Sequence, residues 1–377
     1  MKFSFDAQRA LFPILAHKAQ LSSCSQSALS TPVEEAITQY MASWRELGMH
    51  WVGWGVTLDR AKAGFARLIG ADSADIAVMS CVSDLASSVG NCLEFGAQRN
   101  GIVLGEIDFP SLGHVWLAQQ GRGARVSFVG ADGQGAIALE DYQRAIGEHT
   151  RLVSVSHVSY SNGFKQDIGA IAALAHARDA LIFVDAYQSV GAMQIDVLRD
   201  DIDILVCGAQ KYLLGCPGIA FMYVRRELAQ GLRPANTGWF GRVDPFAFDI
   251  RQLDYADGAR RFDTGTPPYI NAAAAGAGMA LLNSLDMAAV ESHIEHLSAV
   301  ALQAAKDHGL RIASPMDPKL KGSNTAIFVD NSAAVEKQMA DAGFIVSARG
   351  AVIRVAPHFY NTGEEVAAAM AALARLL

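Results

Sequence analysis

Charge and long apolar runs are both scarce in this sequence. Only 18% of the 377 residues are charged, and acidic residues outnumber basic ones by 38 to 31, which gives a net charge of −7. An acidic chain offers no electrostatic attraction to nucleic-acid phosphates, so we expect no nucleic-acid partner. The longest apolar stretch, Ala272 to Leu282, is shorter than the ~20 residues that a membrane helix needs. We therefore expect no membrane partner either.

Patterns typical of metal sites and of secretion are also missing. The five cysteines are odd in number and scattered, and no CxxC pair or Cys/His cluster occurs, so we expect no metal site. The first 20 residues place Asp6, Arg9, His17 and Lys18 around a short apolar run, whereas a secretory signal has basic residues first and then an unbroken apolar core. From this we expect a cytoplasmic protein.

Short apolar runs recur along the first two thirds of the chain and predict strands. Most of them are continuously apolar rather than alternating, which is typical of strands that are covered on both faces. The runs are Ile76–Met79, Ile102–Leu104, Val126–Val129, Leu152–Ser156, Leu181–Val184, Ile202–Cys207 and Ile219–Val224. Helical patterns lie between several of them, at Asp84–Phe95, Leu139–Gly147 and Ile168–Asp179. Alternating strands and helices predict an α/β fold with a mostly parallel seven-stranded sheet flanked by helices.

The character of the sequence changes after about Thr264. Two helical stretches, Asn271–Leu285 and Met287–His308, precede short strand candidates at Thr325–Val329, Phe344–Val346 and Val352–Val355. A capping box at Thr362 and Glu365 predicts the start of a final amphipathic helix. We predict an N-terminal segment, residues 1–49, that packs on both domains, a large domain over residues 50–263 and a smaller α+β domain over residues 264–377.

The polar residues that follow the predicted strands are the candidates for chemistry. Ligands bind beyond the carboxyl ends of the strands in an open parallel sheet. Asp185 follows one apolar run, Lys211 follows another, and Ser83 begins a helix after a third. Taken singly, an aspartate there is more often a helix cap and a lysine more often a solvated residue. Their joint occurrence at one sheet edge points to an active site.

Three segments around these residues resemble the core of the class V pyridoxal 5′-phosphate (PLP) enzymes: Val153–Gly163, Phe183–Gly191 and Gly208–Gly218. This group includes cysteine desulfurases, kynureninases, isopenicillin-N-epimerase-like proteins and several aminotransferases. Further similarity lies in Asp108-Phe-Pro-Ser111, Gly238-Trp-Phe-Gly241, Phe262–Pro268 and Ile353–Thr362, so it extends over most of the chain. The resemblance implies PLP as cofactor and the fold type I architecture, a large domain with a smaller C-terminal one.

The resemblance also implies roles for single residues. Lys211 corresponds to the Schiff-base lysine, and Asp185 to the carboxylate under the pyridine nitrogen, which keeps the ring protonated and electron-withdrawing. The other residues implied to bind the cofactor are Val82, Ser83, Phe109, Tyr160, Gln188, Gln210, Trp239 and Thr266. Phe109 resembles the ring-stacking residue of kynureninases, and Val82 and Ser83 match the phosphate-binding turn.

Substrate and partner expectations follow from the same resemblance. Arg354 matches the arginine that binds the substrate α-carboxylate, a geometry that suits the guanidinium fork. Arg349 could bind a second acidic group, although a surface role is about equally expected. Thr266 resembles a residue that the neighbouring subunit contributes, which implies a homodimer with shared active sites acting on a small amino-acid substrate.

Three PLP reactions compete at this point. The region Val346–Gly350 lacks the cysteine that desulfurases carry before the arginine strand. Kynureninases place tyrosine and histidine where this chain has Gln210 and Gln188. These departures favour an aminotransferase-like enzyme acting at Cα. A kynureninase-like hydrolase, a C–S lyase or an epimerase remain alternatives, as does an inactive PLP-fold binding protein, which the retained Lys211 and Asp185 disfavour. The absence of GxGxxG and GxxxxGK[ST] patterns disfavours a plain nucleotide-binding protein.

Overall fold

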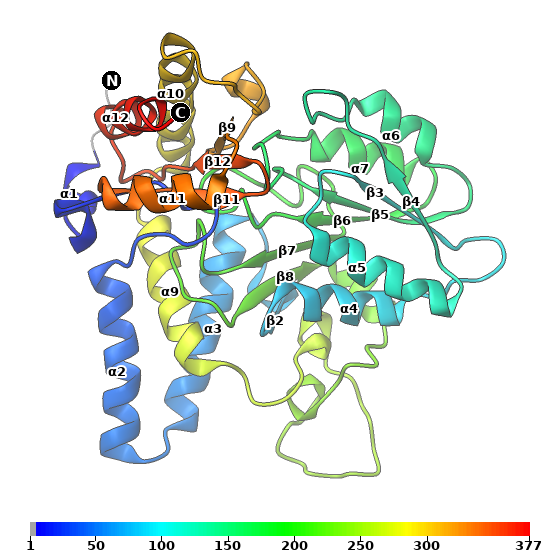
Figure 1. Cartoon of the computed structure of the whole chain (residues 1–377). Coiled ribbons are helices and arrows are strands. Elements are labelled where there is room, and N and C mark those ends of the chain that lie inside the picture. The colour runs from blue at the N-terminus through cyan, green and yellow to red at the C-terminus, as the bar shows by residue number, and fades with distance from the viewer. Residues whose placement is uncertain (1–4) are drawn as a thin grey trace.

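Seven strands form one central sheet in the structure, a computed structural model that describes residues 5–377 (Figure 1). They are β2 (Ile76–Met79), β3 (Gly101–Gly105), β4 (Arg125–Val129), β5 (Thr150–Ser156), β6 (Leu181–Asp185), β7 (Ile204–Gly208) and β8 (Ala220–Val224). Their spatial order is β2-β8-β7-β6-β5-β3-β4, and only β8 runs antiparallel to its neighbours. The predicted mostly parallel seven-stranded α/β sheet is confirmed. Because β2 and β7 are both antiparallel to β8, the carboxyl ends of β2 and β7 lie at the same edge.

Helices cover both faces of this sheet (Figure 1). One face packs against α4 (Val82–Cys92), α5 (Pro110–Ala118) and α8 (Arg226–Gly231). The other packs against α3 (Trp51–Leu68), α6 (Leu139–Ala145), α7 (Ile168–His176) and α9 (Tyr269–Asn283). Neighbouring side chains of a strand enter opposite cores, as Phe183 and Val184 of β6 do, and both are fully buried. Burial on both faces explains why the strands are continuously apolar.

The C-terminal part forms a separate small sheet with its own core. Its elements are α10 (Met287–Asp307), β9 (Thr325–Phe328), α11 (Ser332–Asp341), β10 (Phe344–Ile345), β11 (Ser347–Arg349), β12 (Val352–Val355) and α12 (Gly363–Ala374). The strands β11, β12 and β9 pair in that order. The predicted capping box is confirmed, since Thr362 and Glu365 bond each other's backbone N–H groups. The predicted domain limits stay a prediction, and α9, placed beyond the limit at residue 263, shares a core with α3.

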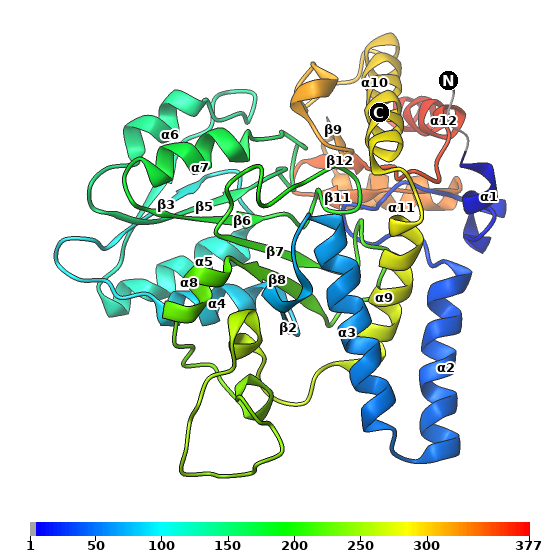
Figure 2. The same cartoon turned by 180° about the vertical axis from the view of Figure 1, so that it is seen from behind.

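The N-terminal residues run along both sheets. Helix α1 (Asp6–Arg9) is followed by β1 (Ala19–Gln20), which pairs with β10, and by α2 (Thr31–Leu47). Helices α2 and α3 pack against α9, as the view from behind shows (Figure 2). Within residues 5–377 no single helix is long and apolar enough to cross a membrane, and α9 and α10 pass that test only as a pair bent by 90°.

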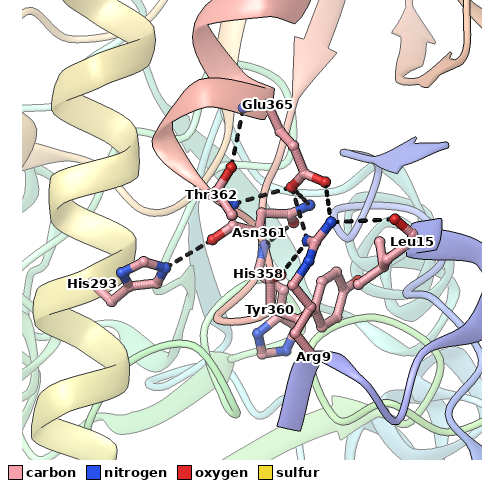
Figure 3. A network of polar contacts seen from close by, with 8 residues as sticks. All are labelled: Arg9, Leu15, His293, His358, Tyr360, Asn361, Thr362 and Glu365. Carbon is pink, nitrogen blue, oxygen red and sulfur yellow. Dashed lines mark hydrogen bonds and ion pairs between the residues drawn. The ribbon is translucent and has the colours of Figure 1, made fainter. Parts of the chain in front are cut away.

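A polar network fixes the turn that follows β12 (Figure 3). The Arg9 guanidinium donates to both carboxylate oxygens of Glu365, at 2.5 and 3.1 Å, and to the Tyr360 carbonyl at 2.6 Å. The His293 ring bonds the Asn361 carbonyl at 2.9 Å, and the buried His358 ring bonds the Tyr212 carbonyl at 3.0 Å. The network therefore joins α1, α10 and α12 to the segment directly after Lys211.

A buried ion pair joins α3 to the sheet. The Lys62 ammonium lies 2.5 Å from one Asp263 carboxylate oxygen, and the other oxygen accepts the Val78 N–H at 2.9 Å. Both side chains are about nine-tenths buried. Removing one partner of such a pair leaves an uncompensated buried charge, which is strongly destabilising.

Replacing Asp263 by alanine is therefore expected to lower the free energy of unfolding by about 3–5 kcal/mol. Urea unfolding followed by circular dichroism measures this. Asp141→Ala is the control, because its ion pair with Arg144 lies at the surface and is expected to contribute less than about 1 kcal/mol. Equal losses in the two variants would contradict a structural role of the buried pair.

Candidate active site

A cavity of about 190 Å³ lies at the carboxyl edge of the central sheet. It is lined by residues that follow β2, β3, β5, β6 and β7, so five strand ends converge on it. Eight predicted site residues line this cavity together: Val82, Ser83, Phe109, Tyr160, Asp185, Gln188, Gln210 and Lys211. The sheet topology thus brings together residues that lie far apart in the sequence, as expected for an open parallel sheet.

The cavity pairs a carboxylate with an amine, and burial shifts both toward their neutral forms. Removal from water lowers the pKa of Lys211 to about 8, although the nearby Asp185 opposes the shift. Burial raises the pKa of Asp185. The Tyr187 N–H, which donates to Asp185 at 2.9 Å, and the charge of Lys211 both act in the opposite direction and lower this pKa. Desolvation therefore outweighs the attraction between the two groups. A lysine with a pKa of about 8 has about a tenth of its population as neutral, nucleophilic amine at pH 7, far more than an exposed lysine has.

Two aromatic rings flank the lysine. Its Nζ lies 4.1 Å from the centroid of the Tyr187 ring and 5.7 Å from that of Phe109. The Tyr187 ring occupies space that Gly208 leaves open, since a Cβ at Gly208 would lie 2.0 Å from the Tyr187 hydroxyl oxygen. The same hydroxyl donates to Gln210 Oε1 at 2.8 Å. These contacts fix the Tyr187 ring beside the Lys211 amine.

A buried carboxylate, that of Asp108, directly precedes Phe109 in the chain. Asp108 accepts the Ser156 N–H at 2.8 Å, and its second oxygen is buried with no partner among the described residues. Burial raises the pKa of Asp108 to about 7. The Phe109 ring meets the Tyr160 ring edge-on, with centroids 5.0 Å apart. Asp108 therefore links the ends of β3 and β5, and Phe109, the next residue in the chain, lines the cavity.

The start of helix α4 forms another wall of the cavity. Its N-cap residue, Cys81, makes no side-chain hydrogen bond to the first turn, although Cys81, Val82 and Ser83 all line the cavity. The first N–H groups of a helix have no intrahelical partner, and with the helix dipole they favour an anion. The uncapped helix start is thus suited to a phosphate group.

Arg354 lies behind the Tyr160 side of the cavity rather than in its wall. It is buried on β12, with 1% of its surface exposed, and its Nη1 donates to the Tyr160 carbonyl at 2.8 Å. Its Nη2 donates to the hydroxyls of Ser25 and Ser347, at 2.8 and 2.6 Å. Its positive charge contributes to the lowered pKa of Lys211, so the guanidinium lies within electrostatic reach of the amine.

Besides Arg354, three predicted site residues lie outside the cavity of this chain. Trp239 packs among aromatic rings, with Phe240, Phe246 and Phe248 within about 4.4–6.1 Å between centroids. Thr266 is exposed on the segment before α9. Arg349 is exposed at the end of β11 and does not reach the cavity. Their predicted roles stay predictions.

The structure also adds residues that the sequence analysis did not single out. Tyr187 and Ser156 line the cavity, and Ser25 and Ser347 bond Arg354. Tyr187 could have been noticed from its place between Asp185 and Gln188. Ser25 and Ser347 carry no such signal, because only the fold brings them to Arg354. Within residues 5–377 no cluster of three or more metal-ligating side chains occurs.

The residues present fit PLP on four observations. The amine of Lys211 is biased to its neutral form, and the buried Asp185 has one oxygen without a protein donor among residues 5–377. Gln188 lines the cavity with a buried, unpartnered Oε1, while its Nε2 donates to the Cys24 carbonyl at 3.1 Å. The uncapped start of α4 is suited to the phosphate. Lys211 would hold the aldehyde, Asp185 the ring nitrogen and α4 the phosphate.

PLP uptake by the enzyme stripped of cofactor is expected to accelerate with pH. Attack on the aldehyde needs the neutral amine, so the rate rises about tenfold per unit below the Lys211 pKa of about 8 and levels off above it. Stopped-flow absorbance over this range, with free lysine and PLP as the control, gives the profile. A midpoint near the value of an exposed lysine, about 10.4, would contradict the effect of burial.

Comparison with known proteins assigns the family. The model of the family "Aminotransferase class-V" matches residues 22–368. An uncharacterized aminotransferase of Bacillus subtilis, YcbU, is 40% identical over 95% of this chain and 94% of its own length. A kynureninase of Pseudomonas fluorescens is 27% identical over 78% of this chain and 72% of its own length.

Solved structures confirm the architecture. The apo cysteine desulfurase of Thermococcus onnurineus superposes with a TM-score of 0.89 at 21% identity, over 100% of this chain and 99% of that one. The predicted fold type I architecture is thereby confirmed, and the family match confirms the predicted cofactor. The chain belongs to the class-V aminotransferase family of PLP-dependent enzymes.

Proposed function

We propose that this protein is a homodimeric aminotransferase that acts on a small amino acid. The observation that carries the proposal is the grouping of Lys211 and Asp185 in one small cavity with Arg354 directly behind it. Exchange of an amino group at Cα needs a base, a partner for the ring nitrogen and a clamp for the carboxylate. This chain supplies all three through Lys211, Asp185 and Arg354.

The division of labour follows from the chemistry of the side chains. PLP, when bound, withdraws electrons from the substrate Cα and so makes its proton removable. The neutral Lys211 amine accepts that proton and can return it. The Asp185 carboxylate holds a proton on the ring nitrogen, and Arg354 orients the substrate by its carboxylate.

Two neighbouring reactions are less well supported. Strand β11, Ser347–Arg349, which precedes β12, offers hydroxyl and guanidinium groups but no thiol, so a persulfide-forming cysteine is missing there. The thiol of Cys81 does line the cavity, but at the start of α4, where the phosphate is expected. Gln210, bonded to the Tyr187 hydroxyl, has no titratable proton for the hydrolysis of a β-ketone.

The proposed homodimer rests on residues without a role in their own subunit. Trp239 and Thr266 lie outside the cavity, and the exposed apolar rings of Phe246 and Phe248 lie against Trp239. A contiguous exposed apolar surface is typical of an interface. Light scattering is expected to give twice the mass of the chain, and a monomer with full activity would contradict shared active sites.

The reaction is tested by following where the amino group goes. Holoenzyme is mixed with single small L-amino acids without an acceptor, and 2-oxo acid, ammonia and sulfide are measured. We expect one equivalent of 2-oxo acid per active site and neither ammonia nor sulfide, with turnover only after a 2-oxo acid acceptor is added. Catalytic release of ammonia would indicate elimination, and release of sulfide from cysteine would indicate C–S cleavage; either would contradict the proposal.

A further inference from the structure

Both terminal nitrogens of Arg354 are engaged by the protein, although Arg354 is the residue expected to bind the substrate. Its two terminal nitrogens bond the Tyr160 carbonyl and the hydroxyls of Ser25 and Ser347. The two hydroxyls also bond each other at 2.8 Å, so Ser25, Ser347 and Arg354 form a closed triangle. With 1% of its surface exposed, the Arg354 side chain is not open to a ligand as it stands. A carboxylate can reach the guanidinium only if one of its present partners leaves.

Two of the three partners are held in place. Ser347 lies directly opposite Arg354 in the β11–β12 ladder and is 6% exposed. The Tyr160 carbonyl belongs to a loop whose next three carbonyls are also bonded from the C-terminal part of the chain. Asn324 Nδ2 donates to Ser161 at 3.1 Å, Ser314 Oγ to Asn162 at 2.6 Å, and the Gly322 N–H to Gly163 at 2.8 Å. The Tyr160 carbonyl cannot leave without breaking this set of bonds, and the buried Ser347 hydroxyl has no water to replace the partner it would lose on rotating away.

Ser25 is the partner that can leave. It is half-buried and lies in a turn between the buried residues Ser22 and Ser27. The segment is anchored on both sides of it by main-chain bonds, from the Ser23 N–H to the Ala356 carbonyl at 3.0 Å and from the Ser27 N–H to the Gln210 carbonyl at 3.1 Å. A rotation about the single Cα–Cβ bond therefore removes the Ser25 hydroxyl from Arg354 without moving the backbone. Because Ser25 is partly exposed, its hydroxyl can then bond water.

The third nitrogen of the guanidinium, Nε, is free to donate to an anion. Arg354 Nε is buried and has no acceptor among the described residues. A buried donor without a partner is costly, and an incoming carboxylate would satisfy it. The neighbouring Cys24 carbonyl accepts Gln188 Nε2, so the Ser25 segment also touches a residue of the cavity wall. Tyr360, which is labelled in Figure 3, also holds the Ser25 segment in place. Its hydroxyl bonds the Ala28 N–H and the Ser23 hydroxyl, both at 3.1 Å.

We propose that Ser25 sets the affinity of the substrate-carboxylate site, because its hydroxyl occupies Arg354 in the free enzyme and is displaced when a carboxylate binds. Ser347 stays in place and orients the guanidinium. The inference rests on the proposed role of Arg354 as the carboxylate clamp, but not on which reaction follows. Ser25 is therefore a positioning residue whose hydroxyl lowers the affinity for a carboxylate. The bond between this hydroxyl and Arg354 must break before the carboxylate can bond the guanidinium.

The test uses propionate, a small carboxylate without an amino group, and propionamide as its uncharged counterpart. Dissociation constants for the holoenzyme are measured by ligand-observed NMR and by the visible absorption of bound PLP. In Ser25→Ala the arginine loses a partner in the free state, so we expect propionate to bind roughly tenfold more tightly, which corresponds to about 1.4 kcal/mol. Ser25→Thr, which keeps the hydroxyl, should restore the wild-type value, and propionamide binding should not change.

Ser22→Ala is the matched control, since this hydroxyl bonds the Gln26 carbonyl in the same segment but not Arg354. Its propionate affinity should equal that of the wild type. Unchanged or weaker binding in Ser25→Ala, or equally tight binding in Ser22→Ala, would overturn the displacement.

Arg354→Lys and Arg354→Met distinguish the proposed role of Arg354 from that of Ser25. If neither weakens propionate binding, Arg354 is not the carboxylate clamp, and both proposals about this site fall; if both do and Ser25→Ala has no effect, only the role of Ser25 falls.

Discussion

Replacing Lys211 by alanine is expected to reduce turnover by at least about 10³-fold and to abolish the covalent attachment of PLP. The amine is both the anchor of the cofactor aldehyde and the base at the substrate Cα, and a positioned general base alone accounts for about 10²–10⁴-fold. Steady-state kinetics and the visible spectrum of the purified variant measure the two effects. PLP can still bind without covalent attachment through Asp185 and the start of α4, so the spectrum is to be read after dialysis.

Lys211→Arg is the matched variant, because it keeps a cation at the position but cannot supply a neutral amine. We expect it to be as inactive as Lys211→Ala. Added methylamine should restore part of the activity of the alanine variant, since a small amine can enter the space that the side chain leaves. Activity of Lys211→Ala within tenfold of the wild type would contradict the assignment.

Replacing Asp185 by asparagine is expected to lower kcat by about 10²–10⁴-fold with little change in fold. The amide has the same shape and can accept the Tyr187 N–H, but it cannot hold a proton on the ring nitrogen of PLP. Without that proton the ring withdraws electrons less strongly from the substrate. Rapid-mixing measurements of 2-oxo acid formation separate this chemical step from binding.

The same variant has a second, independent signature. Asp185 raises the pKa of Lys211 against the effect of burial, so removing its charge should shift the PLP uptake profile to lower pH. Asp108→Asn is the comparison, because Asp108 is also a buried carboxylate but bonds the Ser156 N–H and does not line the cavity. A kcat of Asp185→Asn within a factor of three of the wild type would contradict its role at the ring nitrogen.

Much of the sheet could be predicted from the sequence because its strands are buried on both faces. Continuous apolar runs such as Leu181–Val184 stand out from their surroundings, and all seven predicted runs overlap strands of the central sheet. The order of the strands could not be read in this way, because pairing depends on contacts between distant segments. The short strand β11 was missed as well: Ser347–Arg349 is polar and only three residues long, and its pairing with β12 decides its conformation.

The N-terminal helices could not be predicted from the sequence for a different reason. Helix α3 begins with Trp51 and contains Gly53 and Gly55, which have low intrinsic helix propensity. Packing of α3 and α2 against α9 compensates for that local preference. Tertiary contacts of this kind leave no strong local pattern in a single sequence.

Some residues of the candidate site could likewise be predicted from local sequence and others could not. Residues directly after strands, such as Asp185 and Lys211, were found because the end of a parallel strand marks a position in space. Ser25 escaped notice because it lies in an irregular segment 329 residues from the arginine it bonds. The fold brings this segment, β11 and β12 together, and only the side-chain hydrogen bonds reveal that they share one guanidinium.

The covalent link between Lys211 and PLP is tested most directly by borohydride reduction of the holoenzyme, followed by proteolysis and mass spectrometry. The account predicts one pyridoxyl group per chain, on the peptide that contains Lys211. The informative alternative is Lys321, whose pKa burial lowers to about 7, but whose amine is fully buried and bonded to the Thr325 hydroxyl and the Gly322 carbonyl. Label on Lys321 or on any other lysine, or no label at all in protein saturated with PLP, would contradict the central claim.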